Sequence, residues 1–112
     1  MSYVGGSILS TSVIQTKDGG KVEREDISFG IWESRKYDKN GNMVYFNNSE
    51  GQWQNLHYDE RNRCVKIEFY NGGWQYWSYD ENNRIVLHTD SGGYWQKIDW
   101  KDDNTYEIQT SW

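Results

Sequence analysis

Residues 51–57 read Gly-Gln-Trp-Gln-Asn-Leu-His, residues 72–78 read Gly-Gly-Trp-Gln-Tyr-Trp-Ser, and residues 93–99 read Gly-Tyr-Trp-Gln-Lys-Ile-Asp. Each copy begins Gly-x-Trp-Gln and lies 21 residues after the one before it. A Tyr-Asp dipeptide follows the same period, at residues 37–38, 58–59 and 79–80. A fixed period of this length is typical of a chain built from repeated supersecondary units.

The period divides most of the chain into repeats. We expect a degenerate repeat at 16–36, full repeats at 37–57, 58–78 and 79–99, and a half repeat at 100–112. Residues 1–15 precede the repeats, and their β-prone sequence predicts one or two strands that cap or close the sheet. No shift in composition marks a linker, so residues 1–112 are expected to form a single domain.

The composition favours an all-β fold. Seven Trp, nine Tyr and three Phe supply much of the apolar mass, while Pro is absent and 11 Gly punctuate the chain. Aromatic and β-branched segments between such breaks indicate short strands. We therefore expect an antiparallel meander of tandem 21-residue β-hairpin repeats, with about eight to ten strands, forming a curled or barrel-like sheet.

One set of turns begins with an acidic or polar run at residues 38–41, 59–62 and 80–83, with outer versions at 17–20 and 101–104. The fourth residue is always Gly or Asn, the residues that most easily adopt a positive φ. This pattern predicts a type I turn followed by a left-handed bulge residue. A calcium-binding loop starting at Asp38 is disfavoured, because Met43 and Ser49 occupy the positions that need Gly and Glu.

This turn type predicts which residues face each other. The expected pairs are Asp59–Arg63, Asp80–Arg84, Tyr58–Cys64, Leu56–Lys66, Tyr79–Ile85, Trp77–Leu87, Trp100–Tyr106 and Ile98–Ile108. Because side chains alternate across a strand, the last six pairs share one face with Tyr37, Met43 and Tyr45, and we expect that face to be the core.

The opposite face is expected to be mixed and to carry the contact surface. Its candidate partner-binding residues are Trp32, Trp53, Trp74, Tyr76, Trp95, Phe46, Ile67 and Phe69. Equivalent Trp residues of successive hairpins would lie about 10 Å apart, as separate platforms. Two interpretations of this Trp column stay open: contact with a ligand or partner, or packing against the N-terminal segment or a second subunit.

Charge and cysteine content narrow the function classes. The net charge is −5, and no cationic cluster is present to replace counterions on phosphate, which disfavours direct nucleic-acid binding. Cys64 is the single cysteine, which excludes an intramolecular disulfide and suggests a reducing compartment. No signal peptide and no membrane-spanning window is visible, so a cytoplasmic location is expected.

The sequence contains no arrangement of residues that is typical of an enzyme, a metal site or a cofactor site. His57 and His88 both fall on the expected mixed face, where surface positions explain them better than catalysis. Cys64 falls in the core column and is expected to act as a small apolar filler. The carboxylates cluster in turns, and no facing pair of the kind that glycosidases use stands out.

The chain resembles the YD repeat of Rhs-like proteins, through Tyr37-Asp38…Gly41, Tyr58-Asp59 and Tyr79-Asp80 together with Gly51, Gly72 and Gly93. Asn62 and Asn83 replace the Gly of that family, and Trp100 begins a unit that lacks the dipeptide. The resemblance implies a wall of antiparallel strands without catalysis, and short runs of such repeats are similar to small phage and prophage proteins. The Gly-x-Trp part also resembles choline- and cell-wall-binding repeats, less closely.

These observations favour a non-enzymatic protein-binding module. The resemblance adds the expectation of a small phage or other mobile-element inhibitor that acts on a bacterial host protein through its aromatic face and acidic rim. The alternative is a carbohydrate- or cell-wall-binding module that uses the spaced Trp platforms. A homodimer, with two open sheets packed face to face, is a further expectation.

Overall fold

The computed structural model describes residues 8–111, which form an all-β meander of antiparallel hairpins. The strands are β1 (Ile8–Gln15), β2 (Lys21–Ile27), β3 (Ile31–Tyr37), β4 (Met43–Asn48), β5 (Trp53–Tyr58), β6 (Cys64–Phe69), β7 (Trp74–Tyr79), β8 (Ile85–Asp90), β9 (Trp95–Trp100) and β10 (Tyr106–Thr110). A short 3₁₀ turn, Ser28–Gly30, joins β2 to β3. The expected all-β class and repeated hairpins are confirmed.

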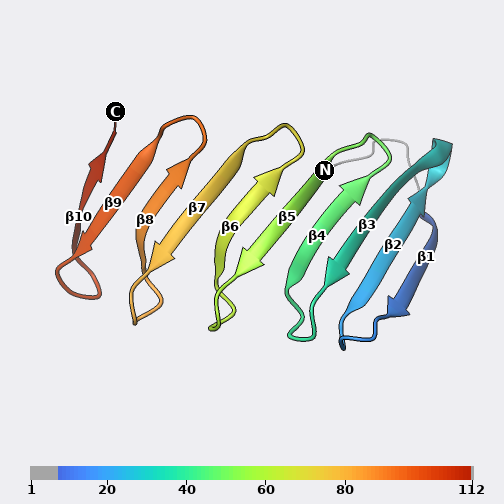
Figure 1. The fold of residues 1–112 in the computed structure, drawn as a ribbon, viewed down its shortest axis with the longest axis horizontal. Helices are drawn as coiled ribbons and strands as arrows, with labels where there is room; N and C mark the ends of the chain where they lie inside the picture. The colour runs from blue at the N-terminus through green and yellow to red at the C-terminus, as the bar shows by residue number, and fades with distance from the viewer. Residues whose placement is uncertain (1–7, 112) are drawn as a thin grey trace. The chain divides into compact units, whose positions relative to one another are not determined.

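The chain divides into two compact units, residues 1–56 and 57–112. Within each unit the strands follow one another in chain order, and each pairs antiparallel with its neighbour in that order (Figure 1). The order begins at β1 and ends at β10, so strand pairing does not close the sheet on itself. The expected meander is therefore open rather than barrel-like.

The Asp-rich loops share one hydrogen-bond pattern. The Asp59 N–H donates to the Arg63 carbonyl at 3.0 Å, and the Asn62 N–H donates to the Asp59 carbonyl at 3.0 Å. The Asp59 Oδ1 atom accepts the N–H groups of Arg61 and Arg63. The fourth residue has a positive φ in the three central loops, at Gly41, Asn62 and Asn83, as expected.

The two outer loops differ from the expectation. The left-handed residue of the first loop is Gly19 rather than Gly20, because the loop is closed by Thr16, whose N–H donates to the Gly20 carbonyl. In the last loop Asn104 does not have a positive φ. There the Asp102 Oδ1 atom accepts the N–H groups of Asn104 and Thr105 instead.

The loops at the other ends of the hairpins are closed by the same pair of main-chain hydrogen bonds. The Gly51 N–H donates to the Asn48 carbonyl, and the Asn48 N–H donates to the Gln52 carbonyl, both at 3.1 Å. Gly51, Gly72 and Gly93 all have a positive φ. The Gly of each Gly-x-Trp-Gln segment is thus the left-handed loop residue that returns the chain into the next strand.

A bulge follows two of the Asp-rich loops and changes the expected register. Tyr79 lies opposite Ile85, but Ser78 lies opposite Leu87, so Val86 is an extra residue on β8. The β3–β4 pair has the same irregularity, with Val44 as its extra residue. One extra residue moves every later side chain of the strand to the other face.

The bulges leave two faces in each unit. We name the face that carries Trp32, Trp53, Trp74 and Trp95 the Trp face, and the opposite face, which carries Tyr37, Trp77 and Tyr79, the Tyr face. The pairs Tyr79–Ile85, Trp100–Tyr106 and Ile98–Ile108 are confirmed. The pair Trp77–Leu87 was wrong, because Trp77 lies opposite His88.

Several single residues lie on the opposite face from the one expected. Tyr45 lies opposite Lys36 and Asn55, and Leu87 lies opposite Ser78, so both belong to the Trp face. Lys66 also belongs there, opposite Tyr76. His88 belongs to the Tyr face, where its ring stacks on Trp77 at 5.2 Å.

The Tyr face contains few fully buried side chains. Ile27, 5% exposed, is the sole buried apolar residue among the described positions. In the first unit this face is polar: Arg35 contacts Glu33 at 2.7 Å and Glu25 at 3.7 Å. Ion pairs and half-buried aromatic residues therefore take the place of the expected Tyr, Leu and Ile core.

In the second unit, arginines connect consecutive loops. Arg63 pairs with Asp59 at 2.8 Å, donates to the Asp80 carbonyl and lies over the Tyr79 ring at 4.8 Å. Arg84 repeats all three contacts one hairpin later, with Asp80, the Asp102 carbonyl and the Trp100 ring. The expected Asp59–Arg63 and Asp80–Arg84 contacts are thus confirmed. Each arginine also links its own Asp-rich loop to the next one along the chain.

Candidate binding surface

The Trp face of the second unit carries a strip of exposed aromatic side chains. Trp74 is 36% exposed, Tyr76 39% and Trp95 36%. The strand register places Tyr76, Thr89 and Trp95 in one row across β7, β8 and β9. Thr89 is the small residue of this row, and it lines a hollow of about 320 Å³ together with Lys66, Trp74 and Tyr76.

Hydrogen bonds fix the backbone at the start of both Trp-bearing strands. The Trp74 N–H donates to Ser91 Oγ at 3.1 Å, and the Ser91 N–H donates to the Trp74 carbonyl at 3.0 Å. Ser111 makes the same two bonds with Trp95, both at 3.0 Å. The indoles therefore project from main chain that is held on both sides.

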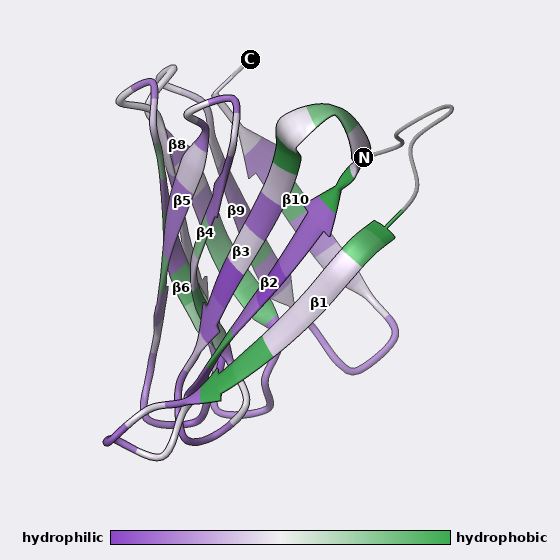
Figure 2. Ribbon diagram, turned by 90° about the vertical axis from the view of Figure 1, so that its right-hand side faces the viewer, coloured by the Kyte–Doolittle hydropathy of each residue, from purple (hydrophilic) through white to green (hydrophobic). Residues whose placement is uncertain are grey.

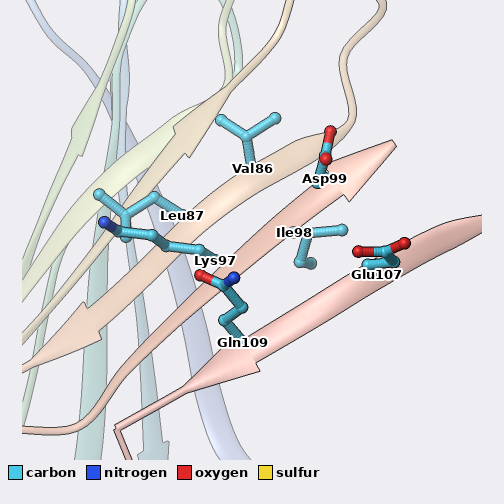
Figure 3. Close-up of a pocket in the computed structure, with 7 residues that line it drawn as sticks. All are labelled: Val86, Leu87, Lys97, Ile98, Asp99, Glu107 and Gln109. Atoms are coloured by element: carbon cyan, nitrogen blue, oxygen red, sulfur yellow. The ribbon is translucent and has the colours of Figure 1, made fainter. Parts of the chain in front are cut away.

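A second hollow of about 410 Å³ continues this surface across β8, β9 and β10, and Figure 3 shows the residues that line it. Leu87 lies opposite Lys97, and Lys97 lies opposite Gln109. The Lys97 Nζ atom is 5.4 Å from the centre of the Trp95 ring, so this cation borders the aromatic strip. Asp99 and Glu107 lie opposite each other at the acidic end of the hollow.

A hydrogen-bonded pair of His57 and Glu68 lies on the same face beside the strip. The His57 Nε2 atom is 2.7 Å from Glu68 Oε1, and Glu68 lies opposite Trp74. This hydrogen bond is the main reason that the pKa of Glu68 lies below its ordinary value. His57 thus lies on the Trp face as expected, with a carboxylate partner at the surface.

The Trp residues of the first unit are less available. Trp32 and Trp53 are only partly exposed. The guanidinium of Arg24 lies 4.6 Å from the centre of the Trp32 ring and pairs with Asp26 at 3.0 Å. The Trp column is therefore not uniform, and the exposed platforms are those of the second unit.

Three of the expected partner-binding residues lie on the other face. Phe46 lies opposite Arg35, and its ring is covered by that guanidinium at 5.8 Å. Ile67 lies opposite Gln75, while its neighbours Lys66 and Glu68 lie opposite Tyr76 and Trp74. Phe69 follows Ile67 by two residues and shares its face. Placing Phe46, Ile67 and Phe69 with the Trp residues was wrong, because regular alternation from the turn does not apply to these strands.

The sequence analysis missed several residues of this surface. Lys66, Leu87 and Thr89 contribute to the two hollows. The signal was the consecutive apolar residues Ile85-Val86-Leu87, which break the alternation expected of a half-buried strand and mark the bulge.

Phe29 is a second residue that the sequence did not single out. It is 88% exposed and has a φ of 69°, within the 3₁₀ turn between β2 and β3. A bulky residue in this region of φ/ψ space is unusual. Phe29 belongs to the first unit and is not part of the strip.

Cys64 is partly buried in β6. Burial raises the pKa of the Cys64 thiol, which keeps it protonated at neutral pH. Across residues 8–111, no three His, Cys, Asp or Glu side chains converge as ligands for a metal ion.

No protein-family model matches the chain, and no curated protein sequence matches it. The resemblance to YD repeats therefore stays a prediction from the quoted residues. The part of the chain that the structure describes contains no helix with the length and apolarity needed to cross a membrane.

Proposed function

We propose that this protein is a non-enzymatic protein-binding module that contacts its target through the Trp face of the second unit. The observation that supports this proposal is the row of exposed aromatic side chains around Thr89, with Trp74, Tyr76 and Trp95 at its centre. Trp and Tyr are the residues most enriched among those that dominate binding energy at protein interfaces. The main-chain bonds from Ser91 and Ser111 limit the ordering cost on binding.

The surroundings of the strip suit a partner with a polar rim around an apolar centre. Lys66, Glu68 and Lys97 border the aromatic rings, and Asp99 and Glu107 lie further along the same face. An aromatic centre within a polar margin is typical of protein interfaces. The YD-repeat resemblance supports one form of the proposal, in which a phage or other mobile element uses the module to inhibit a bacterial host protein.

The test is capture of a partner by the immobilised protein, followed by affinity measurement with the purified partner. We expect the Trp74→Ala/Trp95→Ala double variant to weaken binding at least about tenfold, because truncating central aromatic residues typically costs more than 1 kcal/mol each. Isothermal titration calorimetry gives the dissociation constants.

Tyr106→Ala is the matched control, since Tyr106 is an exposed aromatic residue on the Tyr face of the same unit. It is expected to bind like the unchanged protein. Equal affinity of the double variant and the unchanged protein, or loss of binding in the control alone, would show that the Trp face is not the contact surface.

A carbohydrate-binding function is the second candidate, and the row itself favours it. Tyr76 and Trp95 are two strands apart, about 10 Å, with the small polar Thr89 between them. Two aromatic rings at this separation could stack on sugar rings of an extended glycan.

Trp fluorescence separates the two candidates. Stacking of a sugar on Trp95 predicts a saturable change in emission when soluble cell-wall fragments are titrated, and Thr89→Trp, which fills the hollow, is expected to abolish it. A flat response across a panel of glycans would remove the carbohydrate candidate and leave protein binding unaffected.

A further inference from the structure

The edge strand β1 lacks the features that keep sheet edges apart. All eight of its residues, Ile8–Gln15, are exposed, and none is charged or Pro. Natural proteins usually protect such an edge with charges, prolines or short strands, because an open edge pairs readily with another chain. Among the described residues, β2 is the only strand paired with β1.

The hydrogen-bond phase shows which backbone groups of β1 point outward. The Thr16 N–H donates to the Gly20 carbonyl. Bonded and non-bonded pairs alternate along an antiparallel ladder, and the register from Gln15 to Ser10 has no shift. Ser12 and Ser10 therefore bond to β2, and the N–H and C=O groups of Thr11 and Val13 point away from it.

The sequence of β1 is nearly the same read in either direction. Around Thr11, Ser10 mirrors Ser12, Leu9 mirrors Val13 and Ile8 mirrors Ile14. Figure 2 shows the pattern as a strand that is hydrophobic at both ends and paler in the middle. A two-fold interface requires this property, since the same segment from each copy must be complementary to itself.

We propose that two copies of this protein pair through β1, antiparallel, with the two-fold axis at Thr11. Thr11 then lies opposite Thr11 of the second copy, each Ser10 opposite a Ser12, and each Leu9 opposite a Val13. The outward groups of Thr11 provide about two main-chain hydrogen bonds at the axis, and those of Val13 face Leu9 of the second copy on either side of it. The bulge between Ile8 and Ser10 makes Thr11 and Val13 the regular part of this ladder.

This arrangement differs from the face-to-face dimer expected from the sequence. It uses an edge of the first unit, so it involves no residue of the aromatic strip and does not depend on the proposed function. The strand β10 does not offer an equivalent edge. Glu107 gives it a charge, and its residues Tyr106–Thr110 are not symmetric about Ile108. Pairing of β1 with β10 of another copy would be head-to-tail and would not close a dimer.

The test is the molar mass of the full chain, measured by analytical ultracentrifugation over a range of concentrations. We expect the unchanged protein to form a dimer and Thr11→Pro to be a monomer. Because the Thr11 N–H points away from β2, proline there removes a bond of the dimer and none of the β1–β2 ladder. Circular dichroism checks that the variant stays folded. Ile108→Lys, on the other edge, is expected to remain a dimer.

A pair of charge variants tests the two-fold axis itself. Thr11→Lys and Thr11→Glu each place like charges opposite one another in a homodimer and are expected to be monomers. Mixing the two places opposite charges together and should restore a dimer that contains one copy of each. A monomeric unchanged protein at every concentration, a dimer that persists in Thr11→Pro, or a mixture that stays monomeric would each overturn the proposal.

Discussion

At the scale of single residues, His88 shows how aromatic packing contributes where few apolar side chains are fully buried. Its ring stacks on Trp77 at 5.2 Å with 11° between the planes and meets the edge of Tyr94 at 6.1 Å. Its Nε2 atom is buried without a hydrogen-bond partner. The His88 ring contacts therefore stabilise the fold, while the desolvation of one unpaired nitrogen lowers the free energy of unfolding.

We predict that His88→Phe raises the free energy of unfolding by about 1 kcal/mol, because it keeps the ring contacts and removes the unsatisfied nitrogen. Urea unfolding followed by Trp fluorescence measures the change. His57→Phe is the control and is expected to give no gain, since His57 is exposed and hydrogen-bonded to Glu68. A loss of stability in His88→Phe would mean that Nε2 has a partner in solution.

At the scale of elements, the hairpin loops are the most regular feature of the chain. The same pair of main-chain bonds closes the loops at residues 38–42, 48–52, 59–63, 69–73, 80–84 and 90–94. Each contains a left-handed residue at its fourth position, and two of these are Asn rather than Gly. Side-chain caps such as Asp59 Oδ1 add bonds to two N–H groups of the loop.

We predict that Asn62→Val lowers the free energy of unfolding by about 1–2 kcal/mol, because a β-branched residue is strained at the φ of 62° found there. Thermal and urea unfolding provide the measurement. Asn104→Val is the matched control in the last loop, where φ is not positive, and should change stability by less than about 0.5 kcal/mol. Equal losses in both variants would point to a lost side-chain contact rather than backbone strain.

At the scale of the whole molecule, stability depends on carboxylates in the loops. Partial desolvation alone would raise the pKa of Asp59, but the Arg63 N–H and guanidinium and the Arg61 N–H outweigh it, and the pKa lies below its ordinary value. Asp80 has the same balance, with Arg84 and Asn82 as donors. Each of these carboxylates is thus more acidic in the folded chain than in the unfolded one.

We predict that stability is lost in acid. A carboxylate with a lowered folded pKa stabilises the fold above its unfolded pKa of about 3.9, and this contribution disappears as the pH falls through the folded value. The urea midpoint should therefore decrease from about pH 5 downward. The Asp59→Asn/Asp80→Asn variant should be less stable at pH 7 and show a shallower decrease, and an equally steep decrease would exclude these two groups as its cause.

Much of the fold could be predicted from local chemistry. Loop residues such as Asp59 and Asn62 determine turn type through their own backbone and side-chain bonds, so the three central Asp-rich turns were predicted correctly. The outer loops at 17–20 and 101–104 were not. The faces of later residues were not, because Val44 and Val86 are bulged and each adds one residue to a strand. Trp74, Tyr76 and Trp95 share a face as expected, while Phe46 lies on the other face because of the bulge at Val44. Ile67 and Phe69 of β6 also lie on that other face.

The sequence by itself determined the period, the hairpins and the left-handed positions of the three central Asp-rich loops, because each depends on interactions within a few residues. Only the tertiary structure decided which side chains share a face, since a bulge is set by pairing between strands. It also decided that Arg24 covers Trp32 while Trp74 and Trp95 stay exposed. Exposure depends on what the neighbouring strands place beside a ring, which a repeat spacing does not specify.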